Sequence, residues 1–232
     1  MDTQLLQISR GTPTVELDLI ADLACPWSFL GKRTLERALT SLQGAPQPLL
    51  RWHGLALAGP STVTWQDHLS GRLPRGTSVE ATHSALQQAG RELGITFDFA
   101  RLQRLPDTRD AHRLVLLAAR TGHQNEVIEA LFSAFFEQGR DIADHAVLAE
   151  LAAQCQLEPE IQQAFADPAV AREDIATEER RMRGMGISGV PNVLINGRVL
   201  VPGAVDVATY VQALDQALFP ELPRESDKRH LH

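Results

Sequence analysis

Cysteine is scarce in this chain, and its scarcity excludes a fold held together by disulfides. The 232 residues include only two cysteines, Cys25 and Cys155. A disulfide framework needs several pairs in an oxidising compartment, so two cysteines favour a reducing, cytoplasmic one. Cys155 lies in the helical pattern ELAAQCQLEP, where a free cysteine is most simply a small packed residue. We therefore expect the two thiols not to pair with each other.

Other missing features exclude further classes of protein. No apolar run approaches the roughly 18 residues of a membrane span, and the N-terminus lacks the basic start and apolar block of a secretory signal. Lys and Arg number 22 against 29 Asp and Glu, a net charge of −7, which gives no electrostatic reason to expect a nucleic acid or a membrane as partner. The eight histidines show no zinc-ligand spacing, so we expect no metal site.

What the chain does have is a cysteine where a strand becomes a helix. Residues 15–31, VELDLIADLACPWSFLG, run from an apolar strand into Cys25-Pro26-Trp27-Ser28 and on into a helix. The first backbone N–H groups of a helix are unpaired and its dipole is positive there, which favours a thiolate. Pro26 suits the first helical position because it has no amide hydrogen. We predict that Cys25 is a nucleophile with a lowered pKa.

Ser28 stands where a dithiol motif would carry its second cysteine. A second thiol releases a mixed disulfide by attacking it from within, whereas a hydroxyl cannot, because its pKa is far higher. Ser28 can still donate a hydrogen bond to the Cys25 thiolate. We expect Cys25 to form a mixed disulfide that persists until an external thiol resolves it. Ser28 can be the native residue of a monothiol motif, or it can have been substituted for a cysteine in order to trap complexes. Both would give the same sequence.

The first half of the chain is predicted to be β–α–β followed by helices. Val15–Ile20 and Pro48–Leu57 have strand patterns and are joined by a helix over Trp27–Leu42, which implies a right-handed crossover and a parallel pair. Residues 58–76 are rich in Gly, Pro, Ser and Thr and are expected to form a loop. Apolar residues three and four apart then predict helices, around a short extended piece at Ile95–Phe99, over Ser78–Leu93, Thr108–Arg120, Glu126–Phe136, His145–Gln154 and Glu160–Ala166.

The last part of the chain returns to β structure. A helix over Pro168–Met185 precedes a β-rich run, Gly186–Ile195, a turn at Asn196-Gly197, a strand over Arg198–Val201 and a helix over Val205–Leu218. The fold class is therefore α/β. We assign one domain to residues 1–57 and 186–219 with the connecting helix 168–185, an inserted all-helical domain to 58–167, and a flexible tail to 220–232.

Four stretches together resemble the DsbA-like family of thioredoxin-fold proteins. They are ACPWSFLGKRTLERAL, PDTRDAHRLVLLAA, EALFSAFFEQGRDIADHAVLAELA and GISGVPNVLINGRVLVPGA. They are most similar to the cytoplasmic FrnE branch, whose layout resembles that of 2-hydroxychromene-2-carboxylate isomerases and kappa-class glutathione transferases. The resemblance implies a thioredoxin fold with an inserted helical domain, and thiol–disulfide oxidoreductase activity.

The resemblance also implies a second half of the site at Gly189-Val190-Pro191. It implies that the Val190–Pro191 bond is cis and faces Cys25, leaving the Val190 backbone to pair with an extended substrate. A trans proline opening an edge strand is the alternative. The expected catalytic residues are Cys25 and Ser28, and the expected substrate-binding residues are Pro26, Trp27, Gly189, Val190 and Pro191.

Two polar residues in the second stretch are given structural roles. The family commonly has Asn at the position of Asp107, which we interpret as a helix cap with Asp110 in the first turn. His112 lies on an apolar helix, where a structural histidine is favoured over a catalytic one.

These features predict a cytoplasmic thiol–disulfide oxidoreductase that works through Cys25 alone. We expect no bound cofactor, glutathione as co-substrate, and a protein or small-molecule thiol or disulfide as substrate. The alternative is a glutathione-dependent isomerase or transferase acting on a small aromatic molecule, although such relatives commonly have serine where this chain has Cys25. A third hypothesis is a binding or chaperone module without redox function. Proteins with related layouts include dimers, so a homodimer is one of the two oligomeric states that the sequence allows.

Overall fold

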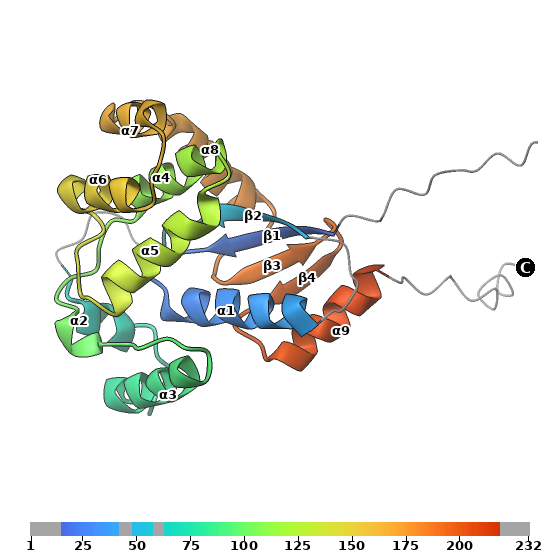
Figure 1. Ribbon diagram of the computed structural model, residues 1–232. Helices are drawn as coiled ribbons and strands as arrows, with labels where there is room; N and C mark the ends of the chain where they lie inside the picture. Colours follow the sequence, from blue (N-terminus) through green and yellow to red (C-terminus); the bar gives the residue numbers. More distant parts are fainter. Residues whose placement is uncertain (1–14, 42–47, 58–62, 219–232) are drawn as a thin grey trace, which may run out of the picture.

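The structure, a computed structural model, describes residues 15–41, 48–57 and 63–218. The predicted tail, 220–232, lies outside the described residues, as do residues 58–62 of the predicted loop. At the centre is a four-stranded sheet in the order β2-β1-β3-β4 (Figure 1). Its strands are β1 Glu16–Ala21, β2 Leu49–Gly54, β3 Asn192–Ile195 and β4 Val199–Pro202.

The pairing of the strands follows from how they are connected. β1 and β2 are parallel, with Leu19 opposite Trp52, because the helix α1, Pro26–Ser41, crosses from the end of one to the start of the other. β1 and β3 are antiparallel. β3 and β4 are also antiparallel and are joined by a tight turn in which Asn196 and Gly197 both have positive φ, as such a turn requires. The predicted thioredoxin fold is confirmed.

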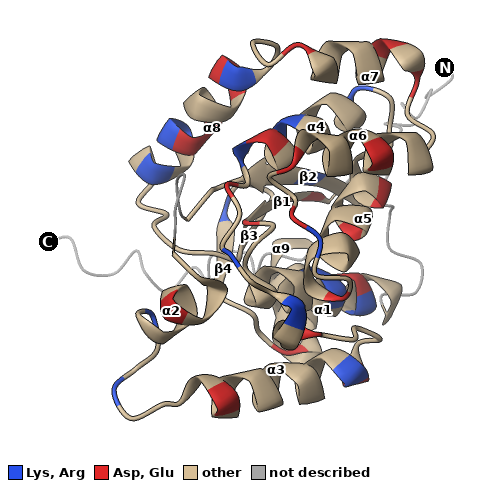
Figure 2. Ribbon diagram, turned by 90° about the vertical axis from the view of Figure 1, so that its left-hand side faces the viewer, with Lys and Arg blue, Asp and Glu red and all other residues tan. Residues whose placement is uncertain are grey.

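Helices cover the sheet on both sides. α1 packs against the last helix, α9 Val207–Leu218, and Figure 1 shows the two side by side. α8, Arg172–Gly184, packs against β2 and carries charges of both signs on its outer side (Figure 2). None of the helices in the described ranges combines the length and the apolarity that a membrane span needs.

A block of helices lies between β2 and α8 in the sequence. In Figure 1 it gathers beyond the carboxyl end of β1. Aromatic rings attach it to α1: Phe29 of α1 stacks on Phe132 with ring centroids 4.6 Å apart. This packing fixes the block against the helix that begins beside Cys25. Its elements are α2 Trp65–Ser70, α3 Val79–Glu92, the 3-10 turn Phe99–Arg101, α4 Arg109–Ala119, α5 Gln124–Phe136, α6 His145–Gln154 and α7 Pro159–Ala166.

One prediction for this block is wrong, because the loop expected over 58–76 contains the helix α2. The piece expected to be extended, Ile95–Phe99, belongs to no strand, and its last residue opens the 3-10 turn. α2 begins because the hydroxyl of Thr64 accepts a hydrogen bond from the N–H of Asp67 at 3.1 Å. This is an N-cap, and the Gly- and Pro-rich flanks concealed it in the sequence.

Gly54 provides a test of how closely the sheet packs on the helical block. An added Cβ there would lie 2.5 Å from Cγ of His112 on α4. We expect Gly54→Ala to lower the free energy of unfolding by about 1–3 kcal/mol, because the clash displaces the imidazole. Urea unfolding would measure the difference. Gly184→Ala is the control, since its Cβ meets no atom within 4 Å; equal stability of the two variants would contradict the packing.

Candidate functional site

Cys25 lies at the turn that joins β1 to α1, as predicted. Its N–H donates to the carbonyl of Asp22 at 3.1 Å, and its own carbonyl accepts from the N–H of Ser28 at 3.0 Å. The second bond forms the first turn of α1, which begins at Pro26. The chain therefore holds the sulfur at the amino end of the helix by backbone hydrogen bonds on both sides.

The loop before β3 faces this cysteine from across the fold. The Val190–Pro191 bond is cis, as the family resemblance implied. The Cys25 thiol donates to the Val190 carbonyl, with 4.0 Å between Sγ and O. Gly31 of α1 makes the approach possible, because an added Cβ would lie 3.0 Å from Cγ of Pro191. Residues 165 positions apart thus meet at one site.

The prediction that the pKa of Cys25 is lowered is wrong. The residue is only 7% exposed, and burial raises the pKa of its thiol to about 11. Hydrogen bonds from the Ser28 hydroxyl and from backbone N–H groups act in the opposite direction, while the negative charge of Asp22 raises the pKa further. The loss of water around the thiolate raises the pKa of Cys25 by more than the position at the start of α1 lowers it. Near neutral pH the resting thiol therefore carries its proton.

Asp22 is a buried carboxylate beside the cysteine. One of its oxygens accepts from the Thr108 hydroxyl at 2.8 Å and from the Ala24 N–H at 3.2 Å, and the other accepts from the Leu57 N–H at 2.9 Å. Burial tends to raise the pKa of Asp22, but His112 and these donors outweigh it, so the pKa lies below its usual value. Asp22 is therefore ionised at neutral pH, within reach of the thiol.

His112 supports this carboxylate from α4. The indole N–H of Trp52 donates to Nδ1 of His112 at 3.2 Å. Because an indole nitrogen only donates, Nδ1 carries no proton and the hydrogen lies on Nε2, which is 3.6 Å from Asp22 Oδ1. His112 is buried and does not line the cavity beside Cys25, which agrees with the structural role expected for it.

Ser28 is fully buried under the motif. Its hydroxyl oxygen accepts a hydrogen bond from the N–H of Asp22 at 3.3 Å, which ties the end of β1 to α1. Its bond to the sulfur lowers the pKa of Cys25, but by less than burial raises it. Ser28 thus moderates the pKa without bringing it near neutrality.

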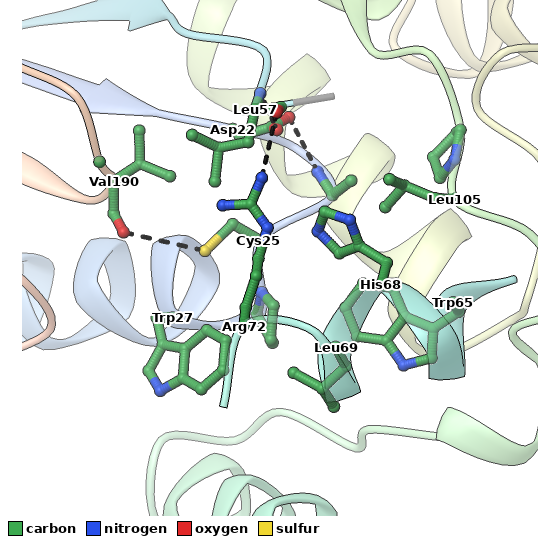
Figure 3. Close-up of a pocket in the computed structure, with 14 residues that line it drawn as sticks. Asp22, Cys25, Trp27, Leu57, Trp65, His68, Leu69, Arg72, Leu105 and Val190 are labelled. Atoms are coloured by element: carbon green, nitrogen blue, oxygen red, sulfur yellow. Dashed lines mark hydrogen bonds between the residues drawn. The ribbon is translucent and has the colours of Figure 1, made fainter. Parts of the chain in front are cut away.

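A cavity of about 170 Å³ opens beside Cys25 (Figure 3). Of the predicted site residues, Cys25, Pro26, Trp27, Gly189 and Val190 line it, whereas Ser28 and Pro191 do not. The remaining walls come mainly from the helical block and the end of β2. They are Asp22, Ala24, Leu57, Trp65, His68, Leu69, Arg72, Leu105 and Pro106.

Sequence reasoning missed the polar groups of this cavity. His68 and Arg72 lie on and just after α2, in the segment that was expected to be a loop. Thr64, three residues before Asp67, was the available sign of a helix start. The burial of Asp22 could also have been predicted, because this acidic residue comes directly after a buried strand and shortly before the cysteine.

Asp107 is not the cap of α4, so that prediction is wrong by one residue. The N-cap is Thr108. The Asp107 carboxylate accepts from the N–H of Arg109 at 3.2 Å and pairs with the guanidinium of the same residue. It lies outside the cavity beside Cys25.

The second cysteine is remote from this chemistry. Cys155 follows α6, is half-buried, and is free, as is Cys25, so the expectation that they do not pair is confirmed. Among the residues in the described ranges, no group of His, Cys, Asp and Glu side chains is arranged to hold a metal ion.

The sheet order, the cysteine at the start of α1 and the cis proline opposite it define a thioredoxin-fold protein. Residues 16–215 match the sequence profile of the DSBA-like thioredoxin domain. The chain belongs to this family, as its motifs predicted. A search of curated protein sequences gives no match.

Several solved structures have the same fold as this chain. A probable DsbA oxidoreductase from Streptomyces coelicolor is 26% identical, with 91% of this chain and 93% of that chain covered and a TM-score of 0.80. The cytosolic disulfide reductase DsbM from Pseudomonas aeruginosa, solved with GSH, is 22% identical (88% and 96% covered, TM-score 0.61). A 2-hydroxychromene-2-carboxylate isomerase is 16% identical (88% and 96% covered, TM-score 0.64).

The charge of Asp22 gives a test of the electrostatics at Cys25. In a Cys155→Ala background, the ultraviolet absorbance of the Cys25 thiolate should appear with a midpoint at about pH 11. Asp22→Asn should lower the pKa of Cys25, because it removes a negative charge that opposes the thiolate. Asp107→Asn, outside the cavity, is the matched control. A wild-type pKa at or below the ordinary value of about 8.5 would contradict the dominance of burial.

Proposed function

We propose that this protein is a cytoplasmic thiol–disulfide oxidoreductase that acts through Cys25 alone. The observation that carries the proposal is that the motif has one thiol and one buried hydroxyl. Cys25 lines the cavity, and Ser28 occupies the position of a resolving cysteine. Cys155, the other cysteine of the chain, belongs to a different part of the fold. The cytoplasmic location is proposed from the scarcity of cysteine.

The reaction has two exchanges of thiol and disulfide. In the first, the Cys25 sulfur loses its proton and attacks one sulfur of a substrate disulfide, so that a mixed disulfide forms and the other substrate sulfur leaves as a thiol. In the second, an external thiol attacks the mixed disulfide, forms a new disulfide with the substrate sulfur and returns Cys25 to the thiol state. Each exchange breaks one sulfur–sulfur bond and makes one.

The Val190 backbone is proposed to hold the substrate during these exchanges. Its carbonyl already faces the Cys25 sulfur, and its N–H has no partner among the described residues. An extended peptide can pair with such an edge through its own backbone. Glutathione is a short peptide with a thiol, which makes it the first external thiol to test. The structure of DsbM with GSH supports the same choice.

The cavity favours one second candidate, a glutathione-dependent isomerase or transferase. Its walls include Trp27, Trp65, Leu69 and Leu105, which suit a small aromatic substrate. This candidate predicts glutathione-dependent turnover of an aromatic substrate that persists in Cys25→Ala.

Oxidised glutathione tests the role assigned to each cysteine. We expect wild-type protein and Cys155→Ala to gain one glutathione by intact mass, and Cys25→Ala to gain none, because only Cys25 lines the cavity. Reduced glutathione should remove the adduct. Equal labelling of Cys25→Ala and Cys155→Ala would contradict the proposal.

A second thiol in the motif tests the role of Ser28. We expect Ser28→Cys to lose the glutathione adduct without added thiol, because the new sulfur lies in the same turn and attacks the mixed disulfide from within. Thr34→Cys, on the same helix but six residues or about 1.7 turns beyond Ser28, is the control and should keep the adduct. An adduct of equal lifetime in wild type and Ser28→Cys would contradict the assignment.

A further inference from the structure

The proposed reaction needs a group that accepts the proton of the Cys25 thiol. Burial keeps the Cys25 thiol protonated near neutral pH, yet the sulfur must lose its proton to attack. Solvent reaches the residue poorly, since it is 7% exposed. A side chain that accepts the proton inside the cavity would remove this obstacle.

Three ionisable side chains line the cavity with Cys25, and two of them are unsuited to accept the proton. The Arg72 guanidinium carries only hydrogen-bond donors and has no acceptor atom. Asp22 is a weak base, because its oxygens already accept three hydrogen bonds, from Ala24, Leu57 and Thr108, and its pKa is lowered.

His68 is the third, and its surroundings suit a base. It projects from α2 into the cavity, on the side away from Val190, with the Arg72 guanidinium between it and Cys25 in the view of Figure 3. Neither ring nitrogen has a hydrogen-bond partner in the described part of the chain. Burial lowers the pKa of His68, Arg72 lowers it further, and Asp22 opposes them. The imidazole is therefore neutral at neutral pH and has a lone pair available.

No other ionisable group in the described ranges competes for this position. His83 of α3, which packs against α2, accepts from the indole of Trp65 at 3.4 Å and does not line the cavity. The charged groups that act on His68 are thus Asp22 from the β1–α1 turn and Arg72 from beyond α2, and Cys25 lines the same cavity.

We propose that His68 exchanges the proton with the sulfur atoms of the reaction, as a general base and then a general acid. The inference rests on the proposed function. His68 takes the proton of the Cys25 thiol through a water in the cavity they share, as the sulfur attacks the substrate disulfide. The same proton then passes to the departing substrate sulfur, which leaves as a neutral thiol, and His68 returns to its neutral form.

The direction of attack supports this assignment. A thiolate attacks a disulfide along the sulfur–sulfur axis, so the departing sulfur moves away from Cys25. The substrate part on the attacked sulfur lies against Val190, and the departing sulfur then enters the cavity on the His68 side. Arg72, whose Nη2 donates to the Leu57 carbonyl at 3.2 Å, stabilises the negative charge on that sulfur until the proton arrives.

The test is the dependence on pH of the rate at which Cys25 reacts with 2-hydroxyethyl disulfide, a neutral probe. In a Cys155→Ala background the rate should rise as His68 loses its proton, at a pH below the ordinary value of about 6.5. It should then stay level through neutral pH and rise again only as the thiolate forms. His68→Gln should lack the level region and react roughly 100-fold more slowly near neutral pH, the scale of general base catalysis.

Two controls separate this role from a structural one. His123→Gln replaces a partly exposed histidine next to α5 and should keep the wild-type profile. Free imidazole should restore part of the rate to His68→Ala and add nothing to wild type. A folded fraction that is constant over the pH range scales a profile without changing its shape, and circular dichroism at each pH checks that it is constant.

The outcomes distinguish the inference from the proposed function. A wild-type rate that rises steadily with pH, with no level region, overturns the role of His68 even if every variant fails to fold. A level region that persists in His68→Gln overturns it as well. In both cases Cys25 still reacts, so the proposed function stands. A Cys25 that reacts at no pH overturns the proposed function, and the role of His68 with it.

Discussion

The removal of the Cys25 sulfur from water is the constraint on which the rest of the site depends. The start of a helix, the Ser28 hydroxyl and two backbone N–H groups all favour a thiolate, yet burial and the charge of Asp22 prevail and raise the pKa to about 11. Near neutral pH the resting cysteine is therefore a thiol and not a thiolate. Such a sulfur is protected against indiscriminate reaction, because the thiolate is the reactive form.

The fold supplies this environment from segments far apart in the chain. The β1–α1 turn provides the sulfur, the loop before β3 provides the Val190 backbone, and the helical block provides Trp65, His68 and Arg72. Phe29 stacking on Phe132 holds α1 against the block. The inserted helices therefore do more than cover the sheet: they complete the wall of the cavity that faces the thiol.

The sequence predicted the parts of this structure that depend on local pattern. The strand that ends before Cys25, Pro26 at the start of α1 and the cis bond before Pro191 follow from short motifs and from the family resemblance. The pKa of Cys25 could not be predicted, because burial depends on residues 165 positions away and on helices whose packing no local pattern records. α2 could not be predicted because the only sign of its start is the single capping residue Thr64, whereas the segments on both sides are rich in glycine and proline.

The Cys25 thiol and the Val190 carbonyl face each other, and together they form the site proposed above for a thiol-bearing peptide. The most direct measurement is a crystal structure of the Cys155→Ala protein after reaction with oxidised glutathione. We expect a disulfide between glutathione and Cys25, with the glutathione backbone paired to the N–H of Val190. Glutathione bound elsewhere with Cys25 still a free thiol, or a mixed disulfide that leaves the Val190 N–H unpaired, would contradict it.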